Sequence, residues 1–303
     1  MTEKHIPVLL GAVMDVLGDV QGMHILDATF GAGGYSRAFL NAGASVVAFD
    51  RDPNVRPDAD AMCAEFGNRF TFVPRPFSEM SEIDDMFDAI VFDLGISSMQ
   101  IDIASRGFSF RADAPLDMRM SESGKTAAEL INELSVPDLT RILREYGDVK
   151  KAAIIANAIK RVAPRTTFAL RDLIYNPHDI APVFQALRIA VNDEMGEIRR
   201  ALDAVPDRLR PGGKCICVTF HSLEDRIVKN TFRTWTTVAG DPRMPVVAKP
   251  AFQALRPQTP SDIELAHNPR ARSAHMRAVV KSYLPHMANF CKIVVERKGK
   301  EKK

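Results

Sequence analysis

A glycine-rich loop near the N-terminus joins an acidic residue to a predicted helix. The loop reads Asp27-Ala-Thr-Phe-Gly-Ala-Gly-Gly34; it follows an apolar run over residues 23–27 and precedes a helix predicted over residues 36–41. Glycines let the backbone approach a ligand, and the N-terminus of a helix offers free N–H groups. The loop therefore predicts a site for a nucleotide-like cofactor, with a tight turn that binds nothing as the alternative.

Two classes of cofactor use a loop of this kind. A dinucleotide site wants a third glycine at the end of G-x-G-x-x-G, and that position is Ser36 in this chain. S-adenosylmethionine has no pyrophosphate, so its methionine part does not need the third glycine. The sequence Gly31-Ala-Gly-Gly34 therefore favours S-adenosylmethionine.

Further candidate residues follow the other apolar runs. Asp50 lies 19 residues past Gly31, where a carboxylate can accept hydrogen bonds from ribose hydroxyls; the alternative is a helix cap. Asp93 ends the fourth run, at the edge of the sheet where open α/β folds bind ligands. Phe77 follows the third run and could stack on an adenine, although a phenylalanine is more often part of the core.

The elements that must position these residues alternate between strand and helix. Apolar runs occur over residues 23–27, 44–50, 70–73 and 87–93, and the next similar run is 214–220. Near-continuous apolar strands separated by helices predict a parallel sheet covered on both faces. The 120 residues from Leu94 to Gly213 exceed an ordinary crossover, so an insertion is expected there.

The insertion and the C-terminal part have their own helix and strand signals. Thr126, Ser135 and Thr167 are candidate helix caps, and the apolar spacing over residues 183–202 predicts one long amphipathic helix. A helix is also expected over about residues 223–235. Late strands are expected over residues 277–281 and 292–296, before a basic tail.

The composition excludes several further classes of protein. The 303 residues are 46% hydrophobic with a net charge of +2, which excludes general disorder and a global polycation. Four cysteines are too few for a disulfide scaffold and are expected to be reduced thiols. Without a leader or a long apolar run, a soluble cytoplasmic protein is expected. No motif has metal-ligand spacing, so no catalytic metal is predicted.

Together these motifs resemble the bacterial 16S rRNA (cytosine-N4) methyltransferases over nearly the whole chain. The matching blocks begin with His5-Ile-Pro-Val-Leu-Leu10 and continue through the glycine-rich loop, Asp50-Arg-Asp-Pro53, Asp93-Leu-Gly-Ile-Ser-Ser-Met-Gln-Ile-Asp102, Arg106-Gly-Phe-Ser-Phe110, Pro115-Leu-Asp-Met-Arg119, Phe184-Gln-Ala-Leu-Arg-Ile-Ala-Val-Asn-Asp-Glu194, Phe220-His-Ser-Leu-Glu-Asp-Arg-Ile-Val-Lys229 and Asn268-Pro-Arg-Ala-Arg-Ser273. The resemblance implies a class I, Rossmann-like methyltransferase sheet formed by residues 1–102 and 212–303. It also implies a helical, substrate-recognising insertion over residues 103–211.

The same resemblance implies the activity and its residues. The enzyme would transfer a methyl group from S-adenosylmethionine to N4 of a decoding-centre cytidine, in 16S rRNA or in the small ribosomal subunit. Whether it acts as a monomer or a homodimer stays open. The implied cofactor contacts are Gly33, Gly34, Tyr35, Asp50, Phe77, Asp93 and Gln100. Tyr35 replaces the family's usual histidine, which leaves a backbone contact, and Met99 replaces a common proline beside Gln100.

Two residues are candidates for the chemistry. Asp93 could hold the cofactor or position the cytosine amine, and a role as general base is a second possibility. His221 follows the fifth predicted strand and could line the same cleft, or be a structural residue bonded to Glu224 or Asp225.

Contact with RNA would need a local basic surface, because neutralising phosphates supplies much of the affinity. Residues 150–175 contain six basic residues and one acid, and residues 268–303 contain ten basic residues and two acids. Either segment alone could be an ordinary solvated face. Beside Phe108, Phe110 and Arg111, and with the family resemblance, RNA contact is the better interpretation.

Three other functions compete with this one. An NAD-dependent dehydrogenase is disfavoured by Ser36. A non-catalytic RNA-binding protein need not keep Gly33, Asp50 and Asp93 together. A DNA amino-methyltransferase commonly has Pro-Pro and an aromatic residue after the fourth-strand acid, where this chain has Leu94-Gly-Ile-Ser.

Overall fold

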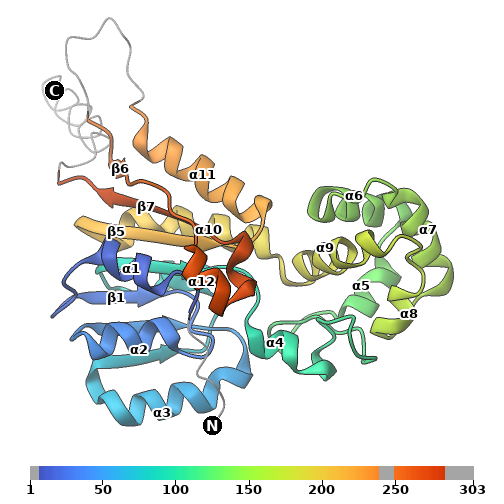
Figure 1. The fold of residues 1–303 in the computed structure, drawn as a ribbon, viewed down its shortest axis with the longest axis horizontal. Coiled ribbons are helices and arrows are strands. Elements are labelled where there is room, and N and C mark those ends of the chain that lie inside the picture. The colour runs from blue at the N-terminus through green and yellow to red at the C-terminus, as the bar shows by residue number, and fades with distance from the viewer. Residues whose placement is uncertain (1–6, 239–248, 284–303) are drawn as a thin grey trace, which may run out of the picture.

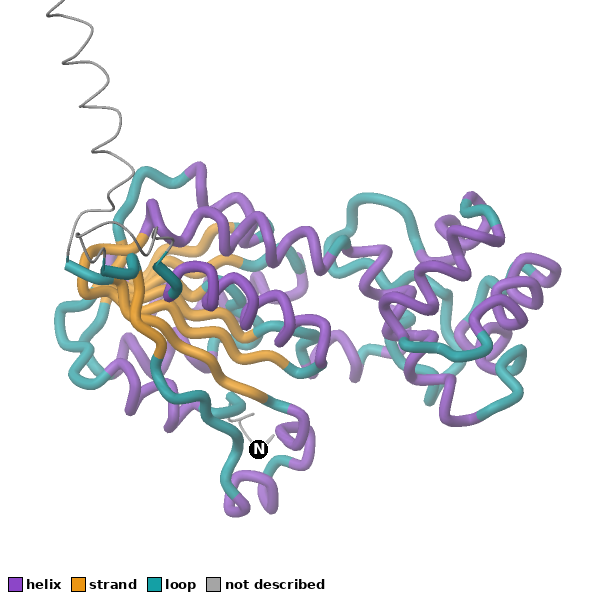
Figure 2. Tube along the Cα trace, turned by 90° about the horizontal axis from the view of Figure 1, so that it is seen from above, coloured by secondary structure: helices purple, strands orange, loops and turns teal. Residues whose placement is uncertain are grey.

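The computed structural model describes residues 7–238 and 249–283, and it has two lobes (Figure 1). One lobe is a twisted sheet covered by helices, and the other is a bundle of short helices. Figure 2, turned by 90°, shows the same separation of the two lobes. In the described part of the chain, no helix is long and apolar enough to cross a membrane.

The sheet has seven strands in the order β3-β2-β1-β4-β5-β7-β6. The first five strands run parallel, and β7 is antiparallel between β5 and β6. The strands are β1 (His24–Asp27), β2 (Ser45–Phe49), β3 (Phe70–Val73), β4 (Phe87–Asp93), β5 (Leu209–Thr219), β6 (Phe252–Ala254) and β7 (His275–Lys281). The predicted α/β sheet is confirmed. The fifth strand begins earlier than expected, because Leu209 already pairs with Phe87.

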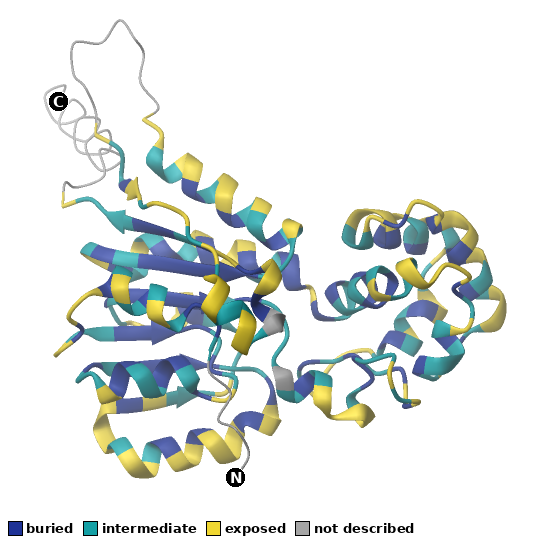
Figure 3. Cartoon of the chain, viewed as in Figure 1, coloured by how far each residue is buried: buried dark blue, intermediate teal, exposed yellow. Residues whose placement is uncertain are grey.

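Alternating side chains of the strands enter two separate cores. Ile25 packs in the core on one face of the sheet, while its neighbour Leu26 packs in the core on the other face. The first face is covered by α1 (Leu10–Leu17), α2 (Gly34–Asn41), α3 (Arg56–Phe66) and α12 (Asp262–His267), and the second by α10 (Glu194–Arg208) and α11 (Ser222–Thr236). Figure 3 shows the buried positions concentrated along the strands. The expected late strand over residues 292–296 lies outside the described residues.

The inserted segment forms a third core of its own, in which Leu139, Ile159 and Leu187 are fully buried. Its helices are α5 (Ala127–Glu133), α6 (Val136–Gly147), α7 (Ala152–Val162), α8 (Thr167–Arg171) and α9 (Ile180–Asn192). The short helix α4 (Ser98–Asp102) precedes them, and its Met99 packs against the core on the first face of the sheet. The capping prediction is confirmed at Thr126 and Ser135, whereas the cap of α8 is Thr166 and not Thr167.

The single long helix expected over residues 183–202 is wrong. Asp193 has a left-handed backbone (φ 47°), which ends α9 at Asn192 and starts α10 at Glu194. Aspartate tolerates this conformation better than most residues, and the apolar stripe continues on both sides, so periodicity hid the break. Because α10 packs on the sheet, the chain leaves the insertion core near Asp193, and the domain boundary at residue 211 stays a prediction.

Candidate active site

A cavity of about 540 Å³ lies at the carboxyl ends of the parallel strands. The loops after β1, β2, β4 and β5 contribute to its wall, which is where open α/β sheets bind ligands. The structure brings seven of the eight predicted site residues to this wall: Gly34, Tyr35, Asp50, Phe77, Asp93, Gln100 and His221. Gly33 supports the loop without lining the cavity.

The two central glycines of the loop are required by their surroundings. Gly33 has φ 76°, and a Cβ there would lie 2.7 Å from Cε of Met62. A Cβ on Gly34 would lie 2.3 Å from Cγ of Pro7. Gly33 caps α2, so the N–H groups of the first turn of α2 begin at the cavity edge. The hydroxyl of Tyr35 is committed, because it donates a hydrogen bond to the carbonyl of Val8.

Asp50 is held by backbone amides and does not cap a helix. One carboxylate oxygen accepts from the Gly31 amide and the other from the Asp52 amide, both at 2.8 Å. The residue that caps the following turn is Asp52, which accepts from the Asn54 amide. Burial raises the pKa of Asp50 to about 6, and the amide bonds only partly offset that effect. Each oxygen keeps a lone pair for a further donor.

Gln100 is tied into the protein at both ends of its amide. Its Nε2 donates to Asp52 at 2.7 Å, and its Oε1 accepts from the Ser97 amide at 3.1 Å. Arg106 donates to both carboxylate oxygens of Asp52 at 3.0 Å. Burial acts to raise the pKa of Asp52, but these hydrogen bonds outweigh it and hold that pKa below its usual value. Gln100 therefore shapes the wall, and its contact with the cofactor stays a prediction.

Asp93 supplies a polar atom that the protein leaves unpaired. The Asp93 amide donates to Oγ1 of Thr29 at 2.7 Å, which fixes the residue at the end of β4. Its Oδ1 is buried and has no hydrogen-bond partner. Burial raises the pKa of Asp93 well above its usual value, and the nearby carboxylates of Asp27 and Glu224 add to the rise. An unsatisfied buried oxygen in a cavity wall fits a site that is completed by a ligand.

His221 combines the two roles that the sequence left open. It lines the cavity and is also the cap of α11, where the Glu224 amide donates to its Nδ1 at 3.4 Å. Glu224 in turn accepts from the Phe220 and His221 amides at 2.8 and 3.2 Å. The structural partner is thus Glu224, since Asp225 pairs with Arg277 at 2.7 Å.

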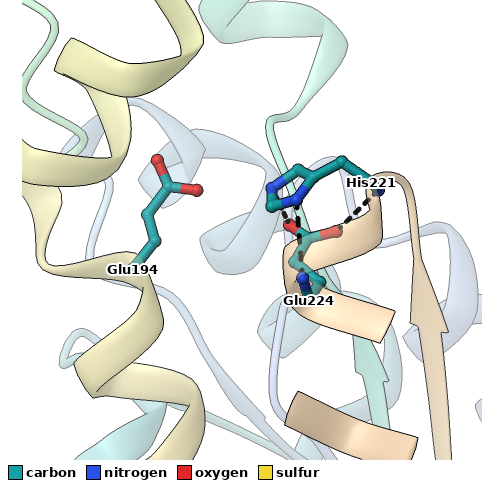
Figure 4. Close-up of side chains that lie close together, drawn as sticks. All are labelled: Glu194, His221 and Glu224. Atoms are coloured by element: carbon teal, nitrogen blue, oxygen red, sulfur yellow. Dashed lines mark hydrogen bonds and ion pairs between the residues drawn. The ribbon is translucent and has the colours of Figure 1, made fainter. Parts of the chain in front are cut away.

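The sequence did not predict several charged residues of the wall as site residues, among them Arg188, Glu194 and Glu224, and Glu224 was expected only as a possible partner of His221. These three lie on α9, α10 and α11, and the guanidinium of Arg188 donates to both carboxylate oxygens of Glu194 at 2.7 and 2.9 Å. Figure 4 shows Glu194 facing the pair formed by His221 and Glu224. Their distant positions in the chain gave no spacing signal; only their presence inside two family-like blocks pointed to them.

The facing groups of Glu194, His221 and Glu224 lie within 4.8 Å of one another, which raises the question of a metal ion. His221 Nδ1 accepts an amide proton, so the neutral ring carries its own proton on Nε2. That Nε2 lies 3.0 Å from Oε1 of Glu224, although off the line of a good hydrogen bond. A protonated nitrogen cannot be a metal ligand. The cluster therefore fits a polar contact between His221 and Glu224, beside the ion pair of Arg188 with Glu194, better than a cation site.

Comparison with known proteins identifies the chain. The MraW methylase family matches residues 2–282. The chain belongs to the MraW methylase family. "Ribosomal RNA small subunit methyltransferase H" of Chelativorans sp. (strain BNC1) is 45% identical over 299 residues, which cover 93% of this chain and 88% of that protein. The protein of the same name from Agrobacterium fabrum is 45% identical over 306 residues, with 94% and 90% covered.

Membership of the MraW methylase family makes the protein a methyltransferase with S-adenosylmethionine as methyl donor. The dehydrogenase and the non-catalytic alternatives are thereby excluded. The seven-stranded sheet is that of a class I, Rossmann-like methyltransferase. Among solved structures, an rRNA methylase from Streptococcus thermophilus has a TM-score of 0.44 at 12% identity, over 92% of this chain and 99% of its own. The family assignment rests on the sequence matches.

Proposed function

We propose that this methyltransferase modifies N4 of a cytidine in the decoding centre of 16S rRNA. The observation that carries the proposal is Asp93, whose buried and unpaired Oδ1 belongs to the wall of the cofactor cavity. An acceptor beside the methyl donor suits an exocyclic amine, which has two N–H groups to donate. The relatives' name and the matching sequence blocks supply the substrate class, small-subunit rRNA. Such a substrate would place the enzyme in the cytoplasm.

The cofactor contacts follow from the loops around the cavity. When bound, S-adenosylmethionine supplies a methyl group on a positively charged sulfur. The Asp50 carboxylate can accept from the ribose hydroxyls, and backbone groups at Gly34 and Tyr35 can meet the methionine part. Phe77 packs edge-on against Phe92 with ring centroids 5.8 Å apart, so a face of its ring is available to an adenine.

Asp93 has the central role in the chemistry. The lone pair of cytosine N4 is delocalised into the ring, and an acceptor for its hydrogens helps to localise the pair on nitrogen. Alignment of that lone pair with the methyl carbon supplies most of the rate enhancement, because the sulfonium is already a good leaving group. His221, held as an α11 cap against Glu224, completes the wall on the side of β5.

The insertion carries the basic residues that would meet RNA. Lys150, Lys151, Arg161 and Arg165 are exposed, but Lys160 is not free: its ammonium donates to the carbonyls of Ile131 and Asn132 at 2.9 and 2.8 Å. Lys160 therefore caps the end of α5.

The aromatic residues expected beside the RNA have another role. Phe108 is buried in the insertion core, and Phe110 packs edge-on against Phe184 with ring centroids 5.4 Å apart. Arg111 is exposed and lines the cavity, so it is the residue of that block that can still meet the substrate. The basic C-terminal segment lies mostly outside the described residues. The target base would have to leave its stack to reach the cavity.

Mass spectrometry of nucleosides tests the proposal. Small-subunit rRNA from cells with and without the protein would be digested, and N4-methylated cytidine is expected only where the protein is present. Purified protein with naked 16S rRNA and with assembled subunits would show which of the two is the substrate. A methyl group on another atom, on DNA, or on no rRNA base would contradict the proposal.

A further inference from the structure

Asp93 is half-buried in the cavity wall, and its Oδ1 is a buried oxygen. Burial raises the pKa of Asp93, and the carboxylates of Asp27 on β1 and Glu224 on α11 raise it further by charge repulsion. Tyr35 on α2 and His221 lie in the same wall. Three arginines also line this cavity: Arg188 is paired with Glu194, Arg51 donates to the carbonyl of Asn192, and Arg111 is exposed. Among the described residues, no cation forms an ion pair with Asp93, and its Oδ1 has no hydrogen-bond partner.

A carboxylate in such a place is costly unless something neutralises it. Removing an ion from water costs several kcal/mol, and a buried group takes up a proton when no counter-charge is available. Asp93 therefore has two ways to avoid an isolated negative charge in this cavity. It can bind a proton, or it can lie beside a positively charged ligand.

The methyl donor is a ligand whose charge changes during the reaction. S-adenosylmethionine carries a positive sulfur, and S-adenosylhomocysteine, which remains after the transfer, carries a neutral one. We propose that the protonation state of Asp93 depends on this charge: Asp93 is ionised beside the sulfonium and protonated beside the neutral thioether. The cavity would then hold one compensated charge pair before the transfer and none after it.

Asp93 can also accept the proton that the amine loses in the transfer. The lone pair of the amine forms the new N–C bond, the C–S bond breaks, and its electron pair stays on sulfur. The amine must then lose one proton, and Asp93, whose positive partner has just disappeared, takes it. Total charge is unchanged: a cation and a carboxylate become a neutral thioether and a carboxylic acid. This last step rests on the proposed amine substrate, whereas the dependence of Asp93 on the sulfur's charge does not.

Calorimetric binding of three ligands in buffers of different ionisation enthalpy tests the inference. At pH 7, S-adenosylmethionine and sinefungin, which has a charged amine in place of the methylsulfonium, should each release about one proton more than S-adenosylhomocysteine. Asp50 sits on the ribose side and contributes equally to all three ligands, because they share the ribose. The difference between ligands therefore isolates the charge at sulfur.

Two variants assign the proton. In Asp93→Asn, the difference in proton release between the charged and neutral ligands should disappear. Comparing the variant with the wild type also removes any contribution from the ligands' own ionisation, which is the same for both proteins. Asp50→Asn is the matched control: it should weaken all three ligands and keep the difference. Equal proton release for the three ligands with the wild-type protein, or a difference that survives in Asp93→Asn, would overturn the inference. A normal difference combined with no modified rRNA cytidine would instead reject only the proposed substrate.

Discussion

Arg106 and Asp52 form a buried ion pair that joins the start of the insertion to the turn after β2. The guanidinium Nη1 lies 3.0 Å from both carboxylate oxygens, and the two side chains are 16% and 3% exposed. The other terminal nitrogen of Arg106 donates to the carbonyls of Arg119 and Met120 at 2.8 and 3.0 Å. The pair thus fixes the insertion loop next to Asp50, the residue proposed to hold the ribose.

Breaking this pair should destabilise the protein strongly. Arg106→Met leaves the Asp52 carboxylate buried without its counter-charge, and such a loss costs about 3–5 kcal/mol of unfolding free energy. Urea unfolding followed by circular dichroism measures it. Arg56→Ala is the matched control, because its partner Asp60 and Arg56 itself are both 59% exposed, and about 1 kcal/mol or less is expected there. Similar losses for the two variants would mean that the buried pair has no special weight.

Asp50→Ala should weaken the binding of S-adenosylmethionine. The substitution removes charge-assisted hydrogen bonds to the ribose, each worth about 1.5–3 kcal/mol, which is roughly a 10- to 100-fold rise in Kd. Isothermal calorimetry on the folded variant measures it, with the thermal unfolding midpoint as the check on folding. An unchanged Kd would leave Asp50 as a residue that only organises the Gly31 loop.

The affinity for S-adenosylhomocysteine should depend on the protonation of Asp50. Its pKa is raised to about 6, so the carboxylate acceptor is present above pH 6 and is lost as pH falls through that value. Affinity should therefore decline below about pH 6 in the wild type, and the decline should be absent in Asp50→Asn. Titrations from pH 5 to 8 provide the data. The neutral ligand is chosen because Asp93 is proposed to stay protonated beside it. An equally steep decline in Asp50→Asn would assign the dependence to another group.

Asp93→Asn separates binding from chemistry. A residue that only held the cofactor would raise its Kd and leave the single-turnover rate at saturation nearly intact. Because Asp93 is proposed to position the amine as well, we expect that rate to fall by about 100-fold or more. Rapid-quench methylation of the rRNA substrate at saturating S-adenosylmethionine measures the rate. A wild-type rate under these conditions would exclude contact between Asp93 and the amine.

The exposed basic residues of the insertion should bind phosphates. Changing Lys150, Lys151, Arg161 and Arg165 to serine should weaken rRNA binding and spare cofactor affinity. Each phosphate that is no longer neutralised should reduce the slope of log K against log salt by roughly 0.7–0.9. Lys160→Ser is the control, because Lys160 is bound to two carbonyls and its removal should lower stability without changing the slope. An unchanged slope in the fourfold variant would mean that this face is merely solvated.

The sheet could be predicted from the sequence because its signals are local. Each parallel strand is a short apolar run followed by an acid or a turn, and the glycines of the loop are adjacent in the sequence. The contacts with Met62 and Pro7 that require Gly33 and Gly34 are not visible there. The caps at Thr126 and Ser135 could also be predicted, because side chain and amide are three residues apart.

The remaining features depend on contacts between distant residues. The break at Asp193 interrupts no apolar stripe, so no pattern marks it. Arg188, Glu194 and Glu224 meet only because three helices converge on the cavity. The charge of Lys160 predicts a phosphate contact, but its ammonium donates hydrogen bonds to carbonyls at the end of a neighbouring helix. Charge and periodicity are properties of single segments of the sequence. The helix break, the charged residues of the cavity wall and the position of Lys160 depend on contacts between different segments.

The hydrogen-bond ladder between β4 and β5 passes straight over the insertion. Phe87 pairs with Leu209 and Asp93 pairs with Val218, and the Leu94 amide donates to the Val218 carbonyl. The two strands are therefore hydrogen-bonded along their length, although a long segment of chain separates them in the sequence. The entropy of closing a loop grows only logarithmically with its length, by about 0.6 kcal/mol for each doubling. The helical lobe is therefore inserted between two paired strands at a small entropic cost, and contacts such as Arg106 with Asp52 then hold it against the cavity. The size and charge of the lobe could then differ between relatives without interrupting the pairing of β4 with β5, on which Asp93 is held.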